Sequence, residues 1–402
     1  MSMVSAFCPG HVSCIFQPVS SYDAMSSGSR GVGIRLSIGS KACVEPRDDG
    51  VVNIWLDDVQ SIAHITRMAA QILAPDRGFD IHISNDLPVS QGFGMSASGA
   101  IAAAICIADI TGQSRTRAFE AAHAAEVMGG GGLGDVSAIV AGRDVPVRTV
   151  AGFPPYGTVV NADFSFPSLT LAVLGPTLET DSVIGDSRRV AAIRDASSSA
   201  MEDFLADPTR DSLFETSNRF SLDSGLESPA IRRLISALNA KGYGAGMCML
   251  GNSIFTDAPE SVVWAILGRG HARTYSCSSS SKEIVLNRRR SRSLVQSEQH
   301  VVAADIEQPD AGPAVQPCVR IVHRREGRDI ISAFLEVLRI RIVAVRHLQE
   351  AVCQASVVRL LRCRDPDLGE RSRRYVEVLL HAFVRYDVLL LRHGSEDALL
   401  IE

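Results

Sequence analysis

The sequence predicts an α+β protein with two domains followed by an arginine-rich extension. Short apolar segments bounded by Gly, Pro, Ser or Asp mix with helix-spaced apolar residues over residues 1–150, and the same mixture returns over residues 151–286. From residue 287 the composition changes abruptly. With 402 residues and 46% hydrophobic content, each domain can bury its own core.

The first domain, residues 1–150, contains both strand-like and helix-like segments. Its expected strands are Val4–Phe7, Gly33–Ile38, Val51–Leu56 and Phe79–Ser84. Its expected helices run from Asp57 or Asp58 to about Leu73, from about Ser98 to Ile110, and from about Arg115 to Met128. In the first helix, Val59 and Ile62 begin the apolar series that recurs at helical spacing.

The second domain, residues 151–286, follows the turn-rich segment AGFPPYG. Its expected strands are Leu169–Leu174, Gly246–Phe255 and Arg273–Cys277. Three helix-like stretches, the last near Pro229–Asn239, precede the second strand, and a further helix is expected near Pro259–Leu267. This order predicts a second α+β domain.

The extension, residues 287–402, carries about half of the arginines and no lysine. Helical apolar spacing persists in Ile330–Val343 and Tyr375–Leu391. One interpretation is a basic helical appendage for a partner or RNA. The interpretation that we favour is a non-native, frameshifted or disordered extension without function, because the change is abrupt and aromatic residues are few.

Composition narrows the class of protein. A formal charge of −5 and 5% aromatic residues disfavour a nucleic-acid partner. The longest apolar run, near Ala100–Ile107, is shorter than the roughly 20 residues of a membrane span, and the N-terminus lacks a basic leader. The nine cysteines form no CxxC pair, so we expect reduced thiols in a cytoplasmic protein.

The segment LPVSQGFGMSASGA joins an expected strand to an apolar helix. Glycines let the backbone turn with its N–H groups inward, and the helix N-terminus adds unsatisfied donors, so the segment predicts a phosphate loop. The alternative is an ordinary Gly/Ser turn that caps a buried helix. The candidate nucleotide-binding residues are Pro88, Gly92, Gly94, Met95, Ser96, Ala97 and Ser98.

Two carboxylates flank a second glycine loop in AEVMGGGGLGD. Glu126 ends one helix and Asp135 follows the loop, an arrangement compatible with one metal ligand and one group facing a substrate hydroxyl. Taken singly, each has an ordinary interpretation that we favour: Glu126 as a solvated helix residue and Asp135 as an N-cap of the segment that follows. His11 is a candidate phosphate or substrate contact, and Arg30 and Arg148 are candidates for binding a carboxylate; each also has an ordinary structural or surface interpretation.

Together these segments resemble the GHMP kinase superfamily and, within it, the archaeal pantoate kinases. The resemblance covers about residues 3–286. The segments that carry it, in order, are CPGHVS, SGSRGVGIRLSIG, PVSQGFGMSASGA, AHAAEVMGGGGLGD, AGFPPYG and GYGAGMCMLGNSIF. The phosphate loop is general to the superfamily, whereas the other segments narrow the resemblance.

The resemblance implies a GHMP kinase fold: an N-terminal domain similar to domain 2 of ribosomal protein S5 and a C-terminal ferredoxin-like domain. It implies ATP-dependent phosphorylation of pantoate to 4-phosphopantoate in archaeal coenzyme A synthesis. Ser96 and Glu126 match the residues that hold Mg²⁺–ATP, and Asp135 matches the aspartate that orients or deprotonates the acceptor hydroxyl. Mevalonate kinases have a lysine where this chain has His11, so the lysine that assists the nucleophile there is absent.

Other functions remain open at this point. The same chemistry suits another small alcohol, such as mevalonate, homoserine or shikimate, and the same fold suits a metabolite sensor without activity. Retention of Ser96, Glu126 and Asp135 together favours an enzyme. We expect a small-molecule substrate, no nucleic-acid or membrane partner, and leave a homodimer open as the assembly.

Overall fold

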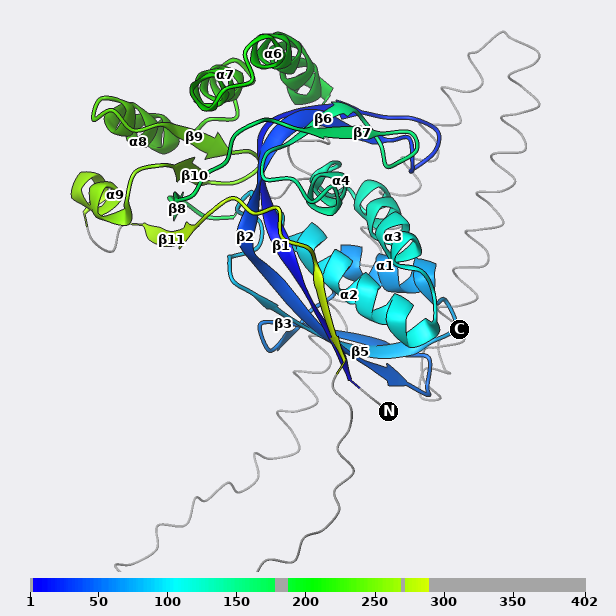
Figure 1. The fold of residues 1–402 in the computed structure, drawn as a ribbon. Helices are drawn as coiled ribbons and strands as arrows, with labels where there is room; N and C mark the ends of the chain where they lie inside the picture. Colours follow the sequence, from blue (N-terminus) through cyan, green and yellow to red (C-terminus); the bar gives the residue numbers. More distant parts are fainter. Residues whose placement is uncertain (1–2, 178–186, 269–271, 289–402) are drawn as a thin grey trace, which may run out of the picture. The chain divides into compact units, whose positions relative to one another are not determined.

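The computed structural model describes residues 3–177, 187–268 and 272–288, which form two sheets with their helices (Figure 1). The expected helices Ile330–Val343 and Tyr375–Leu391 lie outside the described residues. No helix within the described ranges is long and apolar enough to cross a membrane.

The first sheet is built around a long antiparallel hairpin and is covered on one face by four helices (Figure 1). Its strands follow the order β12-β1-β2-β5-β3-β4, and β6 pairs with both β2 and β7. The strands are β1 (Val4–Val19), β2 (Gly28–Arg47), β3 (Val52–Leu56), β4 (Val59–Gln60), β5 (Gly78–Asn85), β6 (Pro146–Val150), β7 (Thr158–Asn161) and β12 (Val285–Arg288). The helices are α1 (His64–Leu73), α2 (Met95–Thr111), α3 (Arg115–Met128) and α4 (Asp135–Val140).

Helix α2 lies at the centre of this layer because its sequence, MSASGAIAAAICIADIT, is small and apolar on all sides. Residues from Ala100 to Ala108 are almost completely buried between the sheet and the other helices. Alanine side chains allow neighbouring backbones to approach closely, so the N-terminus of α2 is held at a fixed place relative to β1 and β2.

The second sheet has the order β11-β8-β10-β9, with every neighbouring pair antiparallel. Its strands are β8 (Leu169–Val173), β9 (Ala245–Cys248), β10 (Ser253–Thr256) and β11 (Arg273–Cys277). Its helices are α6 (Ser187–Ala206), α7 (Arg210–Asp223), α8 (Pro229–Asn239) and α9 (Glu260–Leu267). Among the described residues, α6, α7 and α8 lie between β8 and β9, and α9 lies between β10 and β11, which is a βαββαβ order with an enlarged first crossover.

The chain returns to the first sheet after the second. Strand β12 pairs with β1, with Leu286 opposite Ala6 and Arg288 opposite Val4, so pairing extends two residues beyond the domain end expected at residue 286. Residues of both sheets also share one hydrophobic cluster, in which Val12 and Ile34 of the first sheet join Leu171 and Phe255 of the second.

The helix expected from Asp57 or Asp58 is wrong in its first part. Asp57 and Asp58 have φ of 48° and 65° and form the tight turn between β3 and β4, as two-residue hairpin turns require. Val59 and Ile62 are exposed, and the helix begins only at His64. The apolar spacing predicts too early a start for the helix because the exposed residues Val59 and Ile62 happen to match the period of α1.

Most of the expected strands are confirmed to within one residue at each end, and Arg273–Cys277 coincides with β11. The expected strand Gly246–Phe255 is two strands, β9 and β10, joined by a turn in which Leu250 has a φ of 63°. Val4–Phe7 and Gly33–Ile38 are parts of the much longer β1 and β2. Glycine and proline within these long strands suggested ends where the structure has register shifts.

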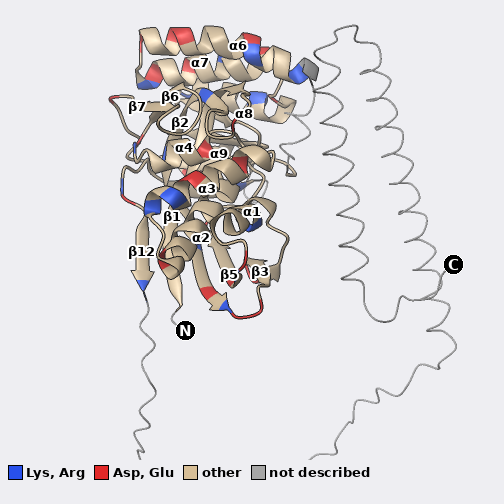
Figure 2. Ribbon diagram, turned by 90° about the vertical axis from the view of Figure 1, so that its right-hand side faces the viewer, with Lys and Arg blue, Asp and Glu red and all other residues tan. Residues whose placement is uncertain are grey.

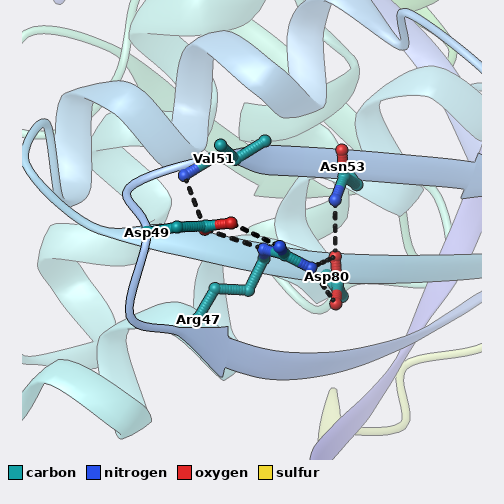
Figure 3. A network of polar contacts seen from close by, with 5 residues as sticks. All are labelled: Arg47, Asp49, Val51, Asn53 and Asp80. Atoms are coloured by element: carbon teal, nitrogen blue, oxygen red, sulfur yellow. Dashed lines mark hydrogen bonds and ion pairs between the residues drawn. The ribbon is translucent and has the colours of Figure 1, made fainter.

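Polar contacts join the C-terminal end of β2 to the N-terminal parts of β3 and β5 (Figure 3). Arg47 of β2 donates to Asp80 of β5 at 2.9 Å and pairs with Asp49 in the following turn. Asn53 of β3 donates to the same Asp80 at 2.8 Å. In the view of Figure 2, acidic and basic residues are interspersed along the ribbon.

Candidate active site

The phosphate loop joins β5 to α2 and has a backbone shape that depends on glycine. Gly92 and Gly94 have φ of 77° and 65°, in the left-handed region that residues with a side chain rarely adopt. Gly94 is the N-cap of α2, and no side chain caps the helix there. The first-turn N–H groups of α2 therefore lack side-chain partners, which suits them to an anion such as a phosphate.

The turn between β9 and β10 holds this loop through Gln91. The Gln91 amide donates to Gly175 O at 3.1 Å and accepts from the backbone N–H of Asn252 at 3.1 Å. The Ser253 hydroxyl donates to the Gln91 carbonyl at 2.6 Å. The backbone also approaches closely, since a Cβ on Gly92 would lie 2.7 Å from Met249 O. The segment MLGNSIF thus shapes the loop from the second sheet.

The expected loop residues have different environments. Ser96 is exposed on the first turn of α2, so its hydroxyl is accessible to a ligand. Met95 and Ala97 are buried in the core, which leaves only their backbone groups for binding, and Pro88 is partly exposed.

Ser98 is buried, and its hydroxyl is occupied within the fold. It donates to Cys8 O at 2.7 Å and accepts from Ser40 N at 3.1 Å. The hydroxyl therefore links α2 to β1 and β2. The expectation that Ser98 offers a hydroxyl to the nucleotide is not supported by this geometry.

Glu126 and Asp135 are brought together by the five-glycine loop. The loop folds back on the end of α3, where Gly131 N donates to Glu126 O at 2.8 Å. Val136 N donates to Glu126 Oε2 at 3.3 Å, while Oε1 is buried without a partner. Glu126 is 1% exposed, so it is not a solvated helix residue. Asp135 is the first residue of α4 and Gly134 is its N-cap, so Asp135 is not a helix cap either.

Asp135 contacts His11 of β1. The His11 Nδ1 lies 2.8 Å from Asp135 Oδ1, and His11 is completely buried. The side chain of Asp135 is 18% exposed, and within the described part of the chain Oδ2 has no hydrogen-bond partner. One carboxylate oxygen is therefore fixed by the protein and the other is available to a substrate. His11, which the sequence suggested as a substrate contact, lies behind Asp135 instead.

Arg148 of β6 is a buried cation with free donors. It is 1% exposed, and its Nε and Nη1 have no partner among the described residues, while Nη2 donates to Ser13 Oγ at 3.4 Å. The Ser29 hydroxyl, 2% exposed, is also unpartnered. A Cβ on Gly134 would lie 2.2 Å from Ser29 Oγ and 2.7 Å from Arg148 Nε, so both groups pack closely against the backbone of this glycine.

Arg35 shows that the free donors of Arg148 are unusual for this fold. It is equally buried, but Nε donates to Ile139 O at 2.9 Å, Nη1 to Ser280 O at 2.5 Å and Nη2 to Lys282 O at 2.6 Å. Buried polar groups are normally satisfied in this way. The unpaired nitrogens of Arg148 therefore suit it to bind an anionic group.

Arg30 lies elsewhere. It donates from Nε to Thr149 O at 3.1 Å and from Nη1 to Gln17 Oε1 at 3.2 Å. Its neighbours in β2, Ser29 and Gly31, are the residues close to Arg148, and side chains alternate across a strand. The structure therefore does not place Arg30 with the carboxylates.

Burial and charge determine the protonation of this cluster. Burial, with a contribution from Asp135, raises the pKa of Glu126 to about 8, so a nearby cation is needed to hold it ionised near neutral pH. Burial lowers the pKa of His11 against the opposing effect of Asp135. Burial also lowers the pKa of Arg148, although both carboxylates oppose this.

Sequence reasoning missed three residues that help to form the site. Ser29 and Gln91 lie inside segments that carried the resemblance but gave no reason to single them out. His123 lies one helical turn before Glu126, and its Nε2 is 3.1 Å from both Ala24 O and Ser27 O. It supports the turn that leads to Ser29. A buried histidine bonded only to carbonyl oxygens leaves no recognisable sequence signal.

Comparison with known proteins agrees with this geometry. Residues 60–143 match the model of the GHMP kinases N terminal domain. The chain is 31% identical to the pantoate kinase of Methanospirillum hungatei over 63% of this chain and 87% of that protein. It is 30% identical to the pantoate kinase of Thermococcus kodakarensis with the same coverage. The chain belongs to the pantoate kinase family of GHMP kinases.

A solved structure supports this family assignment. A phosphotransferase related to the CoA biosynthesis pathway superposes with a TM-score of 0.64 at 25% identity, covering 71% of this chain and 98% of that one. The GHMP kinase fold expected from the resemblance is therefore confirmed. In this kinase family member, the phosphate loop and the Glu126–Asp135 pair occupy the matched N-terminal region.

Proposed function

We propose that this chain transfers the γ-phosphoryl group of ATP to the primary hydroxyl of pantoate, giving 4-phosphopantoate and ADP. The observation that carries the proposal is the pairing of Asp135, with one free carboxylate oxygen, and Arg148, with two buried nitrogens that have no partner among the described residues. A substrate with both a hydroxyl and a carboxylate matches these two groups. Family membership narrows such hydroxy acids to pantoate.

The donor nucleotide would lie at the N-terminus of α2. The backbone N–H groups of the phosphate loop face an anion there, and the helix dipole favours negative charge. The loop is held rigidly by Gln91, so little reorganisation accompanies binding. GHMP kinases use ATP, and we extend this donor to the present chain.

The residues present also fit a magnesium ion. Glu126 Oε1 is a buried carboxylate oxygen without a partner, and Ser96 offers an exposed hydroxyl. The described residues contain no group of three or more His, Cys, Asp or Glu side chains that could hold a metal. Mg²⁺ commonly takes one or two protein ligands and completes its shell with phosphate oxygens and water. When bound, it would neutralise charge on the transferring phosphoryl group.

In the acceptor step, Asp135 would receive the hydroxyl proton on Oδ2. The hydroxyl oxygen forms a bond to the γ-phosphorus, and the bond from that phosphorus to the bridging oxygen breaks, so ADP leaves with the bonding electrons. Phosphoryl transfer depends mainly on alignment and charge neutralisation. The fixed Oδ1 and the free Oδ2 of Asp135 suit this alignment.

Arg148 and Ser29 would bind the acceptor's carboxylate. A guanidinium with two free donors matches a carboxylate in a bidentate arrangement, and the Ser29 hydroxyl adds a third donor. Binding the carboxylate would also offset the cost of burying Arg148 without a partner.

A panel of acceptors tests the proposal. The purified protein is incubated with ATP, Mg²⁺ and, separately, pantoate, mevalonate, homoserine or shikimate, and ADP release is measured. We expect the highest kcat/KM with pantoate. A higher kcat/KM with another acceptor would contradict the substrate assignment, and tight ATP binding without turnover of any acceptor would favour a sensor.

We also propose a cytoplasmic location and leave the homodimer as a prediction. The cysteines within the described residues are unpaired, and burial raises the pKa of Cys8 to about 12, which makes its thiol unreactive. Native mass spectrometry of the whole protein would determine its oligomeric state.

A further inference from the structure

His11 contacts both halves of the site. Its backbone N–H donates to Phe93 O of the phosphate loop at 3.0 Å, and its imidazole Nδ1 lies 2.8 Å from Asp135 Oδ1. The backbone contact reaches the loop that would hold the nucleotide, and the imidazole contact reaches Asp135, the proposed base for the acceptor hydroxyl. A single residue of β1 thus spans the distance between donor and acceptor.

The orientation of His11 is built into the strand pairing. The register of β1 against β2 shifts between Pro9 and His11, an irregularity of the kind that redirects a side chain next to active sites. A Cβ on Gly33 would lie 2.2 Å from His11 Nε2, so the imidazole fills the space that this glycine leaves. A Cβ on Gly94 would lie 3.0 Å from His11 O. The backbone around His11 is therefore closely fitted to it.

The contacts define which nitrogen carries the proton. Nε2 is buried and has no partner, whereas Nδ1 faces a carboxylate oxygen. An imidazolium would leave a charged N–H unpaired at Nε2, which costs far more than an unpaired neutral acceptor. The charged groups that act on the ring are Asp135 of α4 and, with the opposite sign, Arg148 of β6 and Arg35 of β2. The neutral form with the proton on Nδ1 follows from this arrangement.

We propose that His11 is a positioning residue that donates one hydrogen bond to Asp135 Oδ1, turns Oδ2 toward the acceptor hydroxyl, and fixes the base relative to the phosphate loop. This inference rests on the proposed function in so far as Asp135 is the base. In its neutral form, His11 orients the carboxylate of Asp135 without adding positive charge. The positive charge near Asp135 comes from Arg148 instead.

Three substitutions separate positioning from packing. Asn at position 11 can place an N–H near the Nδ1 position, Gln places its amide one bond further out, and Leu keeps bulk without a donor. We expect His11→Leu and His11→Gln to lower kcat about 10²-fold with the KM for ATP unchanged, because misplacing a reacting group has about this effect. His11→Asn should restore most of the lost kcat. His82→Asn, an exposed histidine stacked on Trp55, is the matched control.

The pattern across the three variants gives a readout that packing alone would not produce. Loss of packing follows the volume of the new side chain, whereas loss of the hydrogen bond follows the position of its donor. His11→Asn should therefore keep most of kcat although asparagine is smaller than histidine. Equal kcat in a folded His11→Leu protein and in the wild type would overturn the inference. Equal kcat in His11→Asn and His11→Gln would overturn it too.

A substrate-free measurement keeps the two proposals apart. Nitrogen-15 NMR of the His11 imidazole, without ATP or acceptor, reports which ring nitrogen carries the proton. We expect the proton on Nδ1, where it can be donated to Asp135 Oδ1. If the wild type does not phosphorylate pantoate, the proposed function fails while this measurement still decides the role of His11. A proton on Nε2 would refute that role.

Discussion

Glu126 and Asp135 are carboxylates separated by one glycine loop, and the fold gives them different environments. Glu126 is 1% exposed and has one unpaired oxygen, whereas the side chain of Asp135 is 18% exposed and has one oxygen fixed by His11. Two carboxylates in different environments take different roles. The buried carboxylate of Glu126 is suited to binding a cation, and the accessible carboxylate of Asp135 is suited to accepting a proton.

Asp135→Asn tests the role of the accessible carboxylate. The amide keeps the size of the side chain and loses the ability to accept a proton. We expect kcat to fall about 10²–10⁴-fold, the usual contribution of a general base, with the affinity for ATP little changed. Steady-state kinetics and ATP titration calorimetry measure the two effects. Activity close to that of the wild type would show that Asp135 is only structural.

The pKa of Glu126 predicts a pH dependence of stability in the absence of metal. Folding raises this pKa from 4.5 to about 8, so the folded protein holds the proton more tightly than the unfolded chain. The contribution to stability is complete below about pH 4.5 and is lost as the pH rises through about 8. Urea unfolding at several pH values should show this decrease in the wild type and a smaller one in Glu126→Gln. Parallel curves would contradict the assignment.

Arg148 and Arg30 form a matched pair for the acceptor site. Arg148 is buried with free donors, while Arg30 is bonded to Gln17 and Thr149. We expect Arg148→Lys to lower kcat/KM for the acceptor about 10²-fold, since lysine lacks the planar pair of donors, with the KM for ATP unchanged. Arg30→Lys should remain within about two-fold of the wild type. Equal losses in both variants would argue against a specific carboxylate site.

At the scale of elements, two turns of the second sheet meet the phosphate loop of the first. Gln91 of the loop bonds to Gly175 after β8 and to Asn252 between β9 and β10. These contacts join segments more than 80 residues apart in the chain, as Gln91 and Gly175 are separated by 84 positions. The second sheet therefore contributes to the nucleotide site by shaping the loop.

Gln91→Ala should weaken nucleotide binding. Removing two side-chain hydrogen bonds, each worth about 1 kcal/mol, frees the loop to adopt other conformations. We expect the KM for ATP to rise about ten-fold with a smaller change in the KM for the acceptor. Gln113→Ala is the control, because Gln113 also bonds to a backbone carbonyl, that of Leu73, but away from the loop. If both variants raise the KM for ATP equally, the loop contact is not specific.

Sequence reasoning located the elements that depend on local pattern and missed those that depend on distant pairing. Helix α3 begins and ends at the expected residues, because Ser114 caps it and Gly129 follows it. The extent of β1 and β2 was missed because their glycines and prolines fit into a long hairpin with shifted register. The turn at Asp57 and Asp58 was missed because positive φ at aspartate leaves little trace in apolar spacing.

The same limit applied to the site. Ser96, Glu126 and Asp135 were found because their glycine loops and order carry a family resemblance. The partnership of His11 with Asp135 spans 124 positions and depends on a register shift, so no local pattern contains it. Which of two candidate arginines faces the carboxylates depends on strand alternation, which only the sheet pairing of Gly31 with Arg148 determines.

At the scale of the whole molecule, the site depends on residues from most of the described chain. β1 supplies His11, β2 supplies Ser29, the loop before α2 supplies the phosphate-binding backbone, α3 and α4 supply the carboxylates, and β6 supplies Arg148. The second sheet fixes the loop through Gln91. On the proposed function, the anionic donor would lie at one end of this arrangement and the hydroxy acid at the other.

Phosphorus-31 NMR of the reaction with ATP, Mg²⁺ and pantoate tests the central claim most directly. The account predicts a new phosphomonoester signal, coupled to the protons of the primary CH₂ of pantoate, that grows in a 1:1 ratio with ADP. Release of ADP with inorganic phosphate and no such signal would contradict it, as would a phosphoester on the secondary hydroxyl.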